Sequence, residues 1–199
     1  MKTILICLIL IILFSSSASA LDGSRKGFLL GGGFGISPNS KWSTAGNEKP
    51  GGGFDLFSNS KVHLSEYDEF GMGAAINLLL GYSWDGYDMI VLEGNFSVYD
   101  SRKYPLRIIN QGFRGISWYR YYGDQGESTF TILGIGQYFF NLEGVFSDNK
   151  PKTGYLIGAG YQFAKHIQVA AYLNGGQTSF SDLEFGHQSL NVIVTAIAF

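Results

Sequence analysis

The sequence predicts an all-β protein, an eight-stranded antiparallel up-and-down transmembrane β-barrel. First, apolar residues alternate with small or polar ones through most of the chain after residue 20, and no long segment there has a helical period. Second, charged residues make up only 15% of the chain, where soluble domains average about 25%. Third, glycine and aromatic residues are abundant, and no apolar run after residue 20 approaches the ~18 residues of a membrane helix. Strands are therefore the elements expected to cross the bilayer.

Residues 1–20 are expected to form a secretory signal peptide. A short basic start precedes the apolar stretch 4–14, and Ala18-Ser19-Ala20 fits a cleavage site. An uncleaved anchor helix is the alternative, but about 11 apolar residues fall well short of the ~20 that span a bilayer. The barrel domain is then 21–199. The one cysteine, Cys7, lies in the leader, so the barrel domain has none. A disulfide, a thiolate nucleophile and a cysteine metal site are therefore excluded there.

Eight strands are predicted, an even number that suits a closed single-chain barrel. In order, they span 27–37, 68–84, 88–99, 107–122, 128–142, 153–164, 166–178 and 188–199. The prolines at 38, 50, 105 and 151 all lie outside these ranges, as expected of residues that cannot donate to a β-ladder.

One face of most strands is apolar and free of charge, and the other is small or polar. The apolar positions, in chain order, include Phe28, Leu30, Phe34, Ile36, Met72, Ile76, Leu78, Leu80, Ile90, Leu92, Phe96, Val98, Tyr155, Ile157, Tyr161, Ile167, Val169 and Leu173. The opposite positions include Gly31, Gly33, Gly35, Gly73, Asn77, Glu93, Asn95, Ser97, Thr129, Thr131, Gln137, Asn141, Gly158, Gly160, Gln162, Gln168 and Asn174. Two strands fit less well: Gly134 and Gly136 fall on the apolar face of 128–142, and 188–199 is apolar on both faces.

The direction of the apolar face decides the class of protein. If it pointed inward, the chain would be a soluble ligand-binding barrel of the lipocalin kind, and the opposite face would meet water. That face carries almost no lysine or glutamate, which soluble sheets normally place there. The pattern therefore favours apolar residues toward lipid and small residues in an interior only wide enough for side chains.

Loop lengths predict the orientation in the membrane. The connections 38–67, 100–106, 143–152 and 179–187 are long or charged, whereas those at 85–86, 123–127 and 165 are short. Outer-membrane barrels place short turns in the periplasm and longer loops outside. Aromatic residues near the short turns are expected to form an inner-leaflet girdle, although high β-propensity alone also explains them: Tyr82, Trp84, Trp118, Tyr119, Tyr121, Tyr122, Phe163 and Phe199.

Glu93 and Arg114 are the most informative charged residues. They lie within adjacent predicted strands, nearly equidistant from a centre near residue 103, and both are assigned to the polar face. Because a charge inside the barrel needs a partner, we predict a lumenal Glu93–Arg114 ion pair, extended by Arg120 and by Asn95 or Asn110. Such a pair can be a gate, but in so narrow a barrel it is expected to be a structural plug.

The pair His187 and Ser189 is the one candidate for catalysis. It resembles the His-x-Ser pair of the outer-membrane lipid A deacylases, but Leu190 follows where that family has asparagine, so we expect no enzyme. His63 and His166 have no neighbouring ligands, and the sequence predicts no metal or cofactor.

The segments GISWYRYYG (115–123), TILGIGQYF (131–139) and GAGYQFAKH (158–166) resemble a group of uncharacterised exported barrels, with the architecture of OmpA and OmpX. The resemblance implies a monomer in the bacterial outer membrane, in contact with outer-membrane lipid and lipopolysaccharide, and inserted by the barrel-assembly machinery. These motifs encode strands and turns rather than chemistry, so the leading hypothesis is a non-enzymatic barrel with a structural, envelope or surface-contact role. A lipid-modifying enzyme and a narrow small-solute channel remain the alternatives. The formal net charge of −2 gives no reason to expect nucleic acid as a partner.

Overall fold

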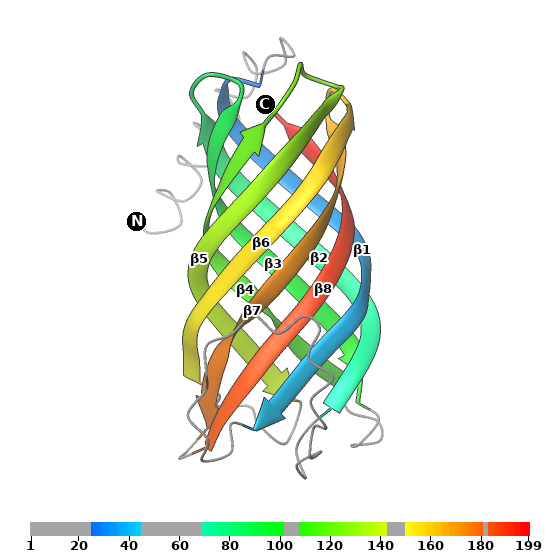
Figure 1. The fold of residues 1–199 in the computed structure, drawn as a ribbon, viewed down its shortest axis with the longest axis vertical. Helices are drawn as coiled ribbons and strands as arrows, with labels where there is room; N and C mark the ends of the chain where they lie inside the picture. Colours follow the sequence, from blue (N-terminus) through cyan, green and yellow to red (C-terminus); the bar gives the residue numbers. More distant parts are fainter. Residues whose placement is uncertain (1–24, 45–68, 102–107, 143–149, 181–182) are drawn as a thin grey trace, which may run out of the picture.

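The computed structural model describes residues 25–44, 69–101, 108–142, 150–180 and 183–199, and in them eight strands form one closed antiparallel barrel (Figure 1). The strands are β1 (Gly27–Thr44), β2 (Glu69–Ser83), β3 (Asp88–Asp100), β4 (Ile108–Tyr121), β5 (Ser128–Leu142), β6 (Lys150–Ala164), β7 (Ile167–Phe180) and β8 (Leu183–Ala198). Each pairs with the next, and β1 pairs with β8 to close the ring. The predicted signal peptide lies outside the described residues. Within the described ranges, no helix is long and apolar enough to cross a bilayer.

All eight predicted strands are confirmed, but several extend further than predicted at the end that carries the longer connections. The predicted loop 179–187 is mostly strand, because β7 and β8 stay paired up to Phe180 and Leu183. Two prolines lie inside strands, contrary to the prediction. Pro38 lies where the β1 register shifts between Ser37 and Ser40, and Pro151 borders a register shift in β6. Such irregularities accommodate a residue without an N–H group.

The apolar face points outward, which confirms the assignment that separates this barrel from a soluble one. Phe34 is 80% exposed, and Ile76, Leu92 and Ile157 are exposed on other strands. The last strand, left undecided by its sequence, places Val192 and Val194 outside and Ile193 inside. An exterior belt of this kind buries its apolar area only in lipid, so the barrel spans a membrane.

The predicted faces of β5 are reversed. Thr129, Thr131, Gln137 and Asn141 point outward, whereas Gly134 and Gly136 lie on the lumenal side between buried Phe130 and Tyr138. The predicted misfit of the two glycines on the lipid face is thereby removed. Polar outward residues at both ends of this strand produced the error, since they lie near or beyond the edges of the apolar belt.

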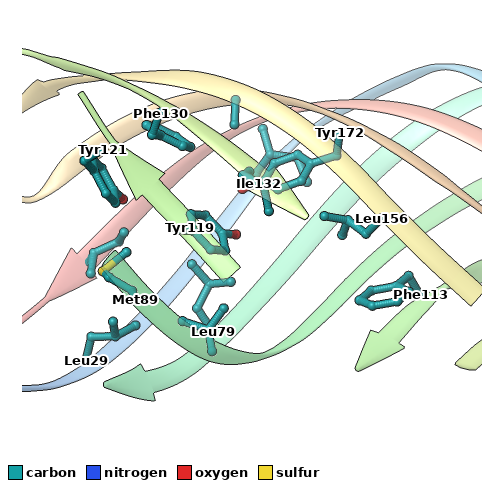
Figure 2. Packing of buried hydrophobic residues seen from close by; sticks show 14 of the residues in the cluster. Leu29, Leu79, Met89, Phe113, Tyr119, Tyr121, Phe130, Ile132, Leu156 and Tyr172 are labelled. Atoms are coloured by element: carbon teal, nitrogen blue, oxygen red, sulfur yellow. The ribbon is translucent and has the colours of Figure 1, made fainter. Parts of the chain in front are cut away.

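Buried side chains fill the lumen. A large apolar cluster extends from the short turns past the middle of the lumen, and it includes Tyr119, Tyr121, Phe130 and Tyr172 from β4, β5 and β7 (Figure 2). A second cluster lies toward the opposite end, where Trp42 packs at 5.2 Å from Phe140 and at 5.8 Å from Phe185 between ring centroids. Side chains rather than solvent thus occupy both halves of the interior, as expected for eight strands.

The outward orientation expected of the aromatic girdle is confirmed for five of its members and wrong for three. Outward and exposed are Tyr82, Trp84, Trp118, Tyr122 and Phe163, joined by Tyr87 and Tyr161. Tyr119, Tyr121 and Phe199 instead point into the lumen. Consecutive aromatic residues on β4 cannot all share one face, because side chains alternate along a strand.

The turn between β2 and β3 is held by Asp85. Its Oδ1 accepts hydrogen bonds from the N–H groups of Tyr87 and Asp88, each at 2.8 Å, and Gly86 adopts a φ of 84°. The bond from Asp88 N–H, followed by that from Tyr87, lowers the pKa of the Asp85 carboxyl. The charged form is therefore favoured in the folded state.

Asp85→Asn is expected to weaken the barrel slightly at neutral pH and not at the lowest pH. Because the folded pKa lies below the unfolded value of about 3.9, the stabilisation is complete above that value and is lost as the pH falls through the folded pKa. Asparagine keeps an acceptor oxygen without the charge. Urea unfolding of the refolded barrel across pH 2–8 measures this effect, and equal midpoints at pH 7 would contradict it.

Candidate functional site

A layer of polar side chains crosses the middle of the lumen, partly within the larger apolar cluster. Asn95 Oδ1 on β3 accepts hydrogen bonds from Asn174 Nδ2 on β7 at 2.8 Å and from Asn191 Nδ2 on β8 at 2.7 Å. Asn77 Nδ2 on β2 donates to Tyr172 OH at 3.1 Å and to Thr195 Oγ1 at 3.0 Å. The Asn95–Asn174 bond joins β3 and β7 on opposite sides of the ring, and the other bonds join strands that are not neighbours, so together they close the interior rather than line a pore.

Glu93 lies in this layer and is 3% exposed. The hydroxyl groups of Ser117 and Tyr119 and the amide of Asn95 surround its carboxyl group, although neither carboxyl oxygen has a hydrogen bond of good geometry within the described residues. Leaving a charged group without such bonds in a low-dielectric interior is costly. Glu93 is therefore the least satisfied ionisable group of the described lumen.

The predicted Glu93–Arg114 ion pair is wrong, because the two side chains lie on opposite faces of the barrel wall. The register pairs Glu93 with Gly115, and Arg114 with Gly94. The sequence estimate placed residues 93 and 114 opposite each other, an error of one residue, and a shift of one residue moves a side chain to the other face.

Both arginines assigned to the lumen are on the exterior. Arg114 Nη2 donates to Gln137 Oε1 at 3.0 Å on the outer surface. Arg120 lies near the short turns and forms an ion pair with Asp88, which also accepts from Trp118 Nε1 at 2.8 Å. Asn110 is exposed as well, so of the two predicted amide partners only Asn95 is in the lumen near Glu93. An arginine facing lipid costs about 2–4 kcal/mol at the bilayer midplane and less toward the interfaces.

His187 and Ser189 both face the lumen and are buried. His187 Nε2 pairs with Thr178 Oγ1 at 2.8 Å, and its ring stacks on Tyr138 at 5.1 Å between centroids. Ser189 Oγ accepts from Asn174 Nδ2 at 3.4 Å. The hydroxyl group thus has no hydrogen bond to the histidine and points away from the surface where an acyl ester would lie.

Arg25, which sequence reasoning missed, closes the short-turn end of the lumen. Its guanidinium lies 4.3 Å from the centroid of the Tyr121 ring and donates to Ser128 Oγ at 3.0 Å. It also donates to the carbonyl oxygens of Gly86 and Gly123, each at 3.2 Å. Arg25 precedes the first strand and belongs to no alternating or spaced motif, so its role is visible only in the three-dimensional structure.

Histidine offers no metal centre within the described ranges. His166 Nδ1 contacts the Ile197 carbonyl oxygen at 3.0 Å, and no group of three or more histidine, cysteine, aspartate or glutamate side chains in these ranges is placed to hold a metal ion. His63 lies outside the described residues.

Comparison with known proteins finds similarity at the level of structure and none by sequence. No family model matches the chain, and no curated protein matches it by sequence. The crystal structure of Neisserial surface protein A superposes with a TM-score of 0.54 at 13% identity, covering 87% of this chain and 98% of that one. The likeness is one of fold.

Two further barrels are similar at lower scores, both from Pseudomonas aeruginosa. The outer membrane protein OprG covers 87% of this chain and 96% of its own, with 12% identity and a TM-score of 0.44. The N-terminal β-barrel domain of OprF covers 86% and 98%, with 15% identity and a TM-score of 0.43.

Proposed function

We propose that the chain is an integral outer-membrane barrel with a closed lumen, acting as a structural or surface-contact protein of the bacterial envelope. One observation carries the proposal: the interior is filled by side chains and crossed by hydrogen bonds, while the exterior carries a lipid-facing apolar belt. Outer-membrane lipid, lipopolysaccharide and, during insertion, the barrel-assembly machinery are the partners of such a protein. We expect it to act as a monomer.

The location is tested by fractionation. Outer membranes are expected to contain the mature chain as a heat-modifiable species, which migrates differently on gels before and after boiling, as a folded barrel does. Recovery of the chain in a soluble periplasmic fraction would overturn the proposal.

The closed lumen predicts no conductance. Planar bilayers containing the refolded wild-type barrel are expected to show no discrete current steps, because Tyr119, Tyr172 and the Asn95 bonds occupy the path. A Tyr119→Ala, Tyr172→Ala double variant removes two of the largest buried side chains and is the matched test for a latent path. Regular steps in the wild type would instead support the channel alternative.

Lipid modification is the second alternative, and the lumenal burial of Ser189 argues against it. Mass spectrometry of lipid A from cells expressing wild type or Ser189→Ala is expected to give identical spectra. A modified species present with the wild type and absent with the variant would establish an enzyme.

A further inference from the structure

Arg25 joins parts of the chain that lie far apart in sequence. It precedes β1, and its guanidinium donates to the carbonyl oxygen of Gly86 in the β2–β3 turn and to that of Gly123 in the β4–β5 turn. It also donates to Ser128 Oγ at the first residue of β5. One side chain therefore holds two of the three short turns together across the end of the lumen.

The third short turn is tied to the same contacts through Gln162. Its Nε2 donates to the Lys165 carbonyl oxygen at 2.8 Å, while its Oε1 accepts from the Gly126 N–H at 3.3 Å and lies 3.5 Å from Ser128 Oγ. Ser128 is thus shared between Arg25 and Gln162. The three turns belong to one polar network that includes the guanidinium.

The β-ladder does not hold Arg25 in place. The first ladder partners of β1 are Gly27 with Ser83, and Leu30 with Ala198. Arg25 lies two residues before the first of these pairs, so its side chain can leave the lumen without breaking any strand pairing. A movement of this kind is a local opening, which costs less free energy than unfolding of the barrel.

The position that the guanidinium occupies is buried, and its partners there are neutral. Arg25 is 3% exposed, its guanidinium lies 4.3 Å from the centroid of the Tyr121 ring, and its hydrogen bonds go to two carbonyl oxygens and a hydroxyl group. Within the described residues it joins no ion pair, and its Nε has no partner. Burial lowers the pKa of the guanidinium, so the charged group is less favoured here than in water. Desolvation therefore opposes the contacts that hold it.

A second position is available beside the first. A pocket of about 180 Å³ lies next to Arg25 at the short-turn end, and Asp85 and Asp124 are among the residues that line it. Asp124 is exposed, and its negative charge acts on the guanidinium. An arginine side chain that rotates into this pocket exchanges its neutral acceptors for a carboxylate partner in contact with water.

We propose that Arg25 is a latch with two positions at the short-turn end of the barrel. In the closed position it holds the turns together and shuts this end of the larger apolar cluster, to which Tyr121 and Met89 belong (Figure 2). In the open position its guanidinium lies in the acidic pocket, and water enters this half of the lumen while all eight strands stay paired. The polar layer around Asn95 remains shut, so the open state is a vestibule and not a pore. The inference goes beyond the proposed function, which concerns the closed lumen as a whole.

A thiol reporter inside the latch tests the proposal, because residues 21–199 contain no cysteine of their own. Met89→Cys places a thiol on the second residue of β3, at a buried lumenal position. The mature chain, refolded in detergent micelles, is treated with a charged methanethiosulfonate reagent. Arg25→Met keeps much of the side-chain length and removes every donor, and it is expected to speed modification of this thiol about tenfold or more. Arg25→Lys keeps the charge without the planar fork of donors, so its rate is expected to lie between the two.

Two controls separate the latch from a general effect. Lys26→Met removes the exposed cation next to Arg25 and is expected to leave the rate unchanged. A Leu156→Cys reporter lies deeper, where β6 pairs with Asn174 of β7, and is expected to stay unreactive in every background. Heat-modifiability of every variant, measured in parallel, confirms folding.

The urea dependence of the Met89→Cys reaction gives a test that needs no change at Arg25. Opening of the latch exposes little surface, so the rate is expected to vary little with urea below the unfolding transition. A rate that rises as steeply as global unfolding would mean that the reagent reaches the thiol only in the unfolded chain, and this would overturn the inference. Equal rates with arginine and methionine at position 25, an equal increase in Lys26→Met, or modification of Leu156→Cys in the Arg25→Met background would overturn it as well.

Discussion

Gly35→Ala is expected to destabilise the barrel by about 1–3 kcal/mol. A Cβ built at Gly35 would lie 1.9 Å from the Val192 carbonyl oxygen and 2.8 Å from Ile193 Cα. Both atoms belong to the backbone of β8, so no side-chain rotation relieves the contact. Because β1 and β8 meet here to close the ring, the two strands must separate or bend.

Gly32→Ala is the control for this substitution. It lies three residues away on the same strand, and its Cβ would meet Leu78 Cδ2 at 3.6 Å, an ordinary contact. Since alanine also reduces the freedom of the unfolded chain, the control is expected to be neutral or slightly stabilising. Urea unfolding in lipid vesicles gives both values. Equal urea midpoints for the two variants would show that β1 and β8 can move apart at Gly35 without loss of stability.

Glu93→Gln is expected to raise the free energy of unfolding of the barrel, whereas Gly35→Ala lowers it. The carboxyl group is buried among Ser117, Tyr119 and Asn95, and in the described part of the chain no cation contacts it, Arg114 being on the other face. Glutamine keeps the shape, adds donors for the surrounding oxygens and removes the cost of a buried charge. A gain of about 1–3 kcal/mol at pH 8 is the expected size.

The exposed Glu127, in the turn before β5, provides the comparison. Glu127→Gln removes the same charge from a solvated position and is expected to change the urea midpoint little. A lower midpoint for Glu93→Gln than for wild type would mean that the carboxylate is held by an interaction the described residues do not include.

The sequence predicted the architecture because a membrane imposes a strict alternation on every strand. Phe34, Ile76, Leu92 and Ile157 were assigned outward correctly, since contact with lipid favours apolar residues there. The same signal fades where strands leave the belt. Thr129 and Asn141 lie at the two ends of β5, and such polar ends explain both the reversed faces of β5 and the strand ends that were predicted too short.

The lumenal site was predictable only in part. The alternation identified Glu93, Asn95 and Asn77 as interior, but the partner of each depends on residues up to 118 positions away across the barrel. Whether Arg114 faces the lumen or the lipid depends on the exact register of β3 and β4. Distance along the sequence from the centre of the hairpin predicts this register only to within one residue.

The bonds from Asn174 and Asn191 to one acceptor on β3 make desolvation of the interior depend on the arrival of the final strand. An open sheet of the first six strands has no donor for Asn95 from either residue, and its inner surface stays wet. Water then leaves the lumen only when β8 pairs with β1 and closes the ring. A partly inserted sheet therefore obtains little stabilisation from its polar layer. The assembly pathway is expected to lack a stable, dry intermediate.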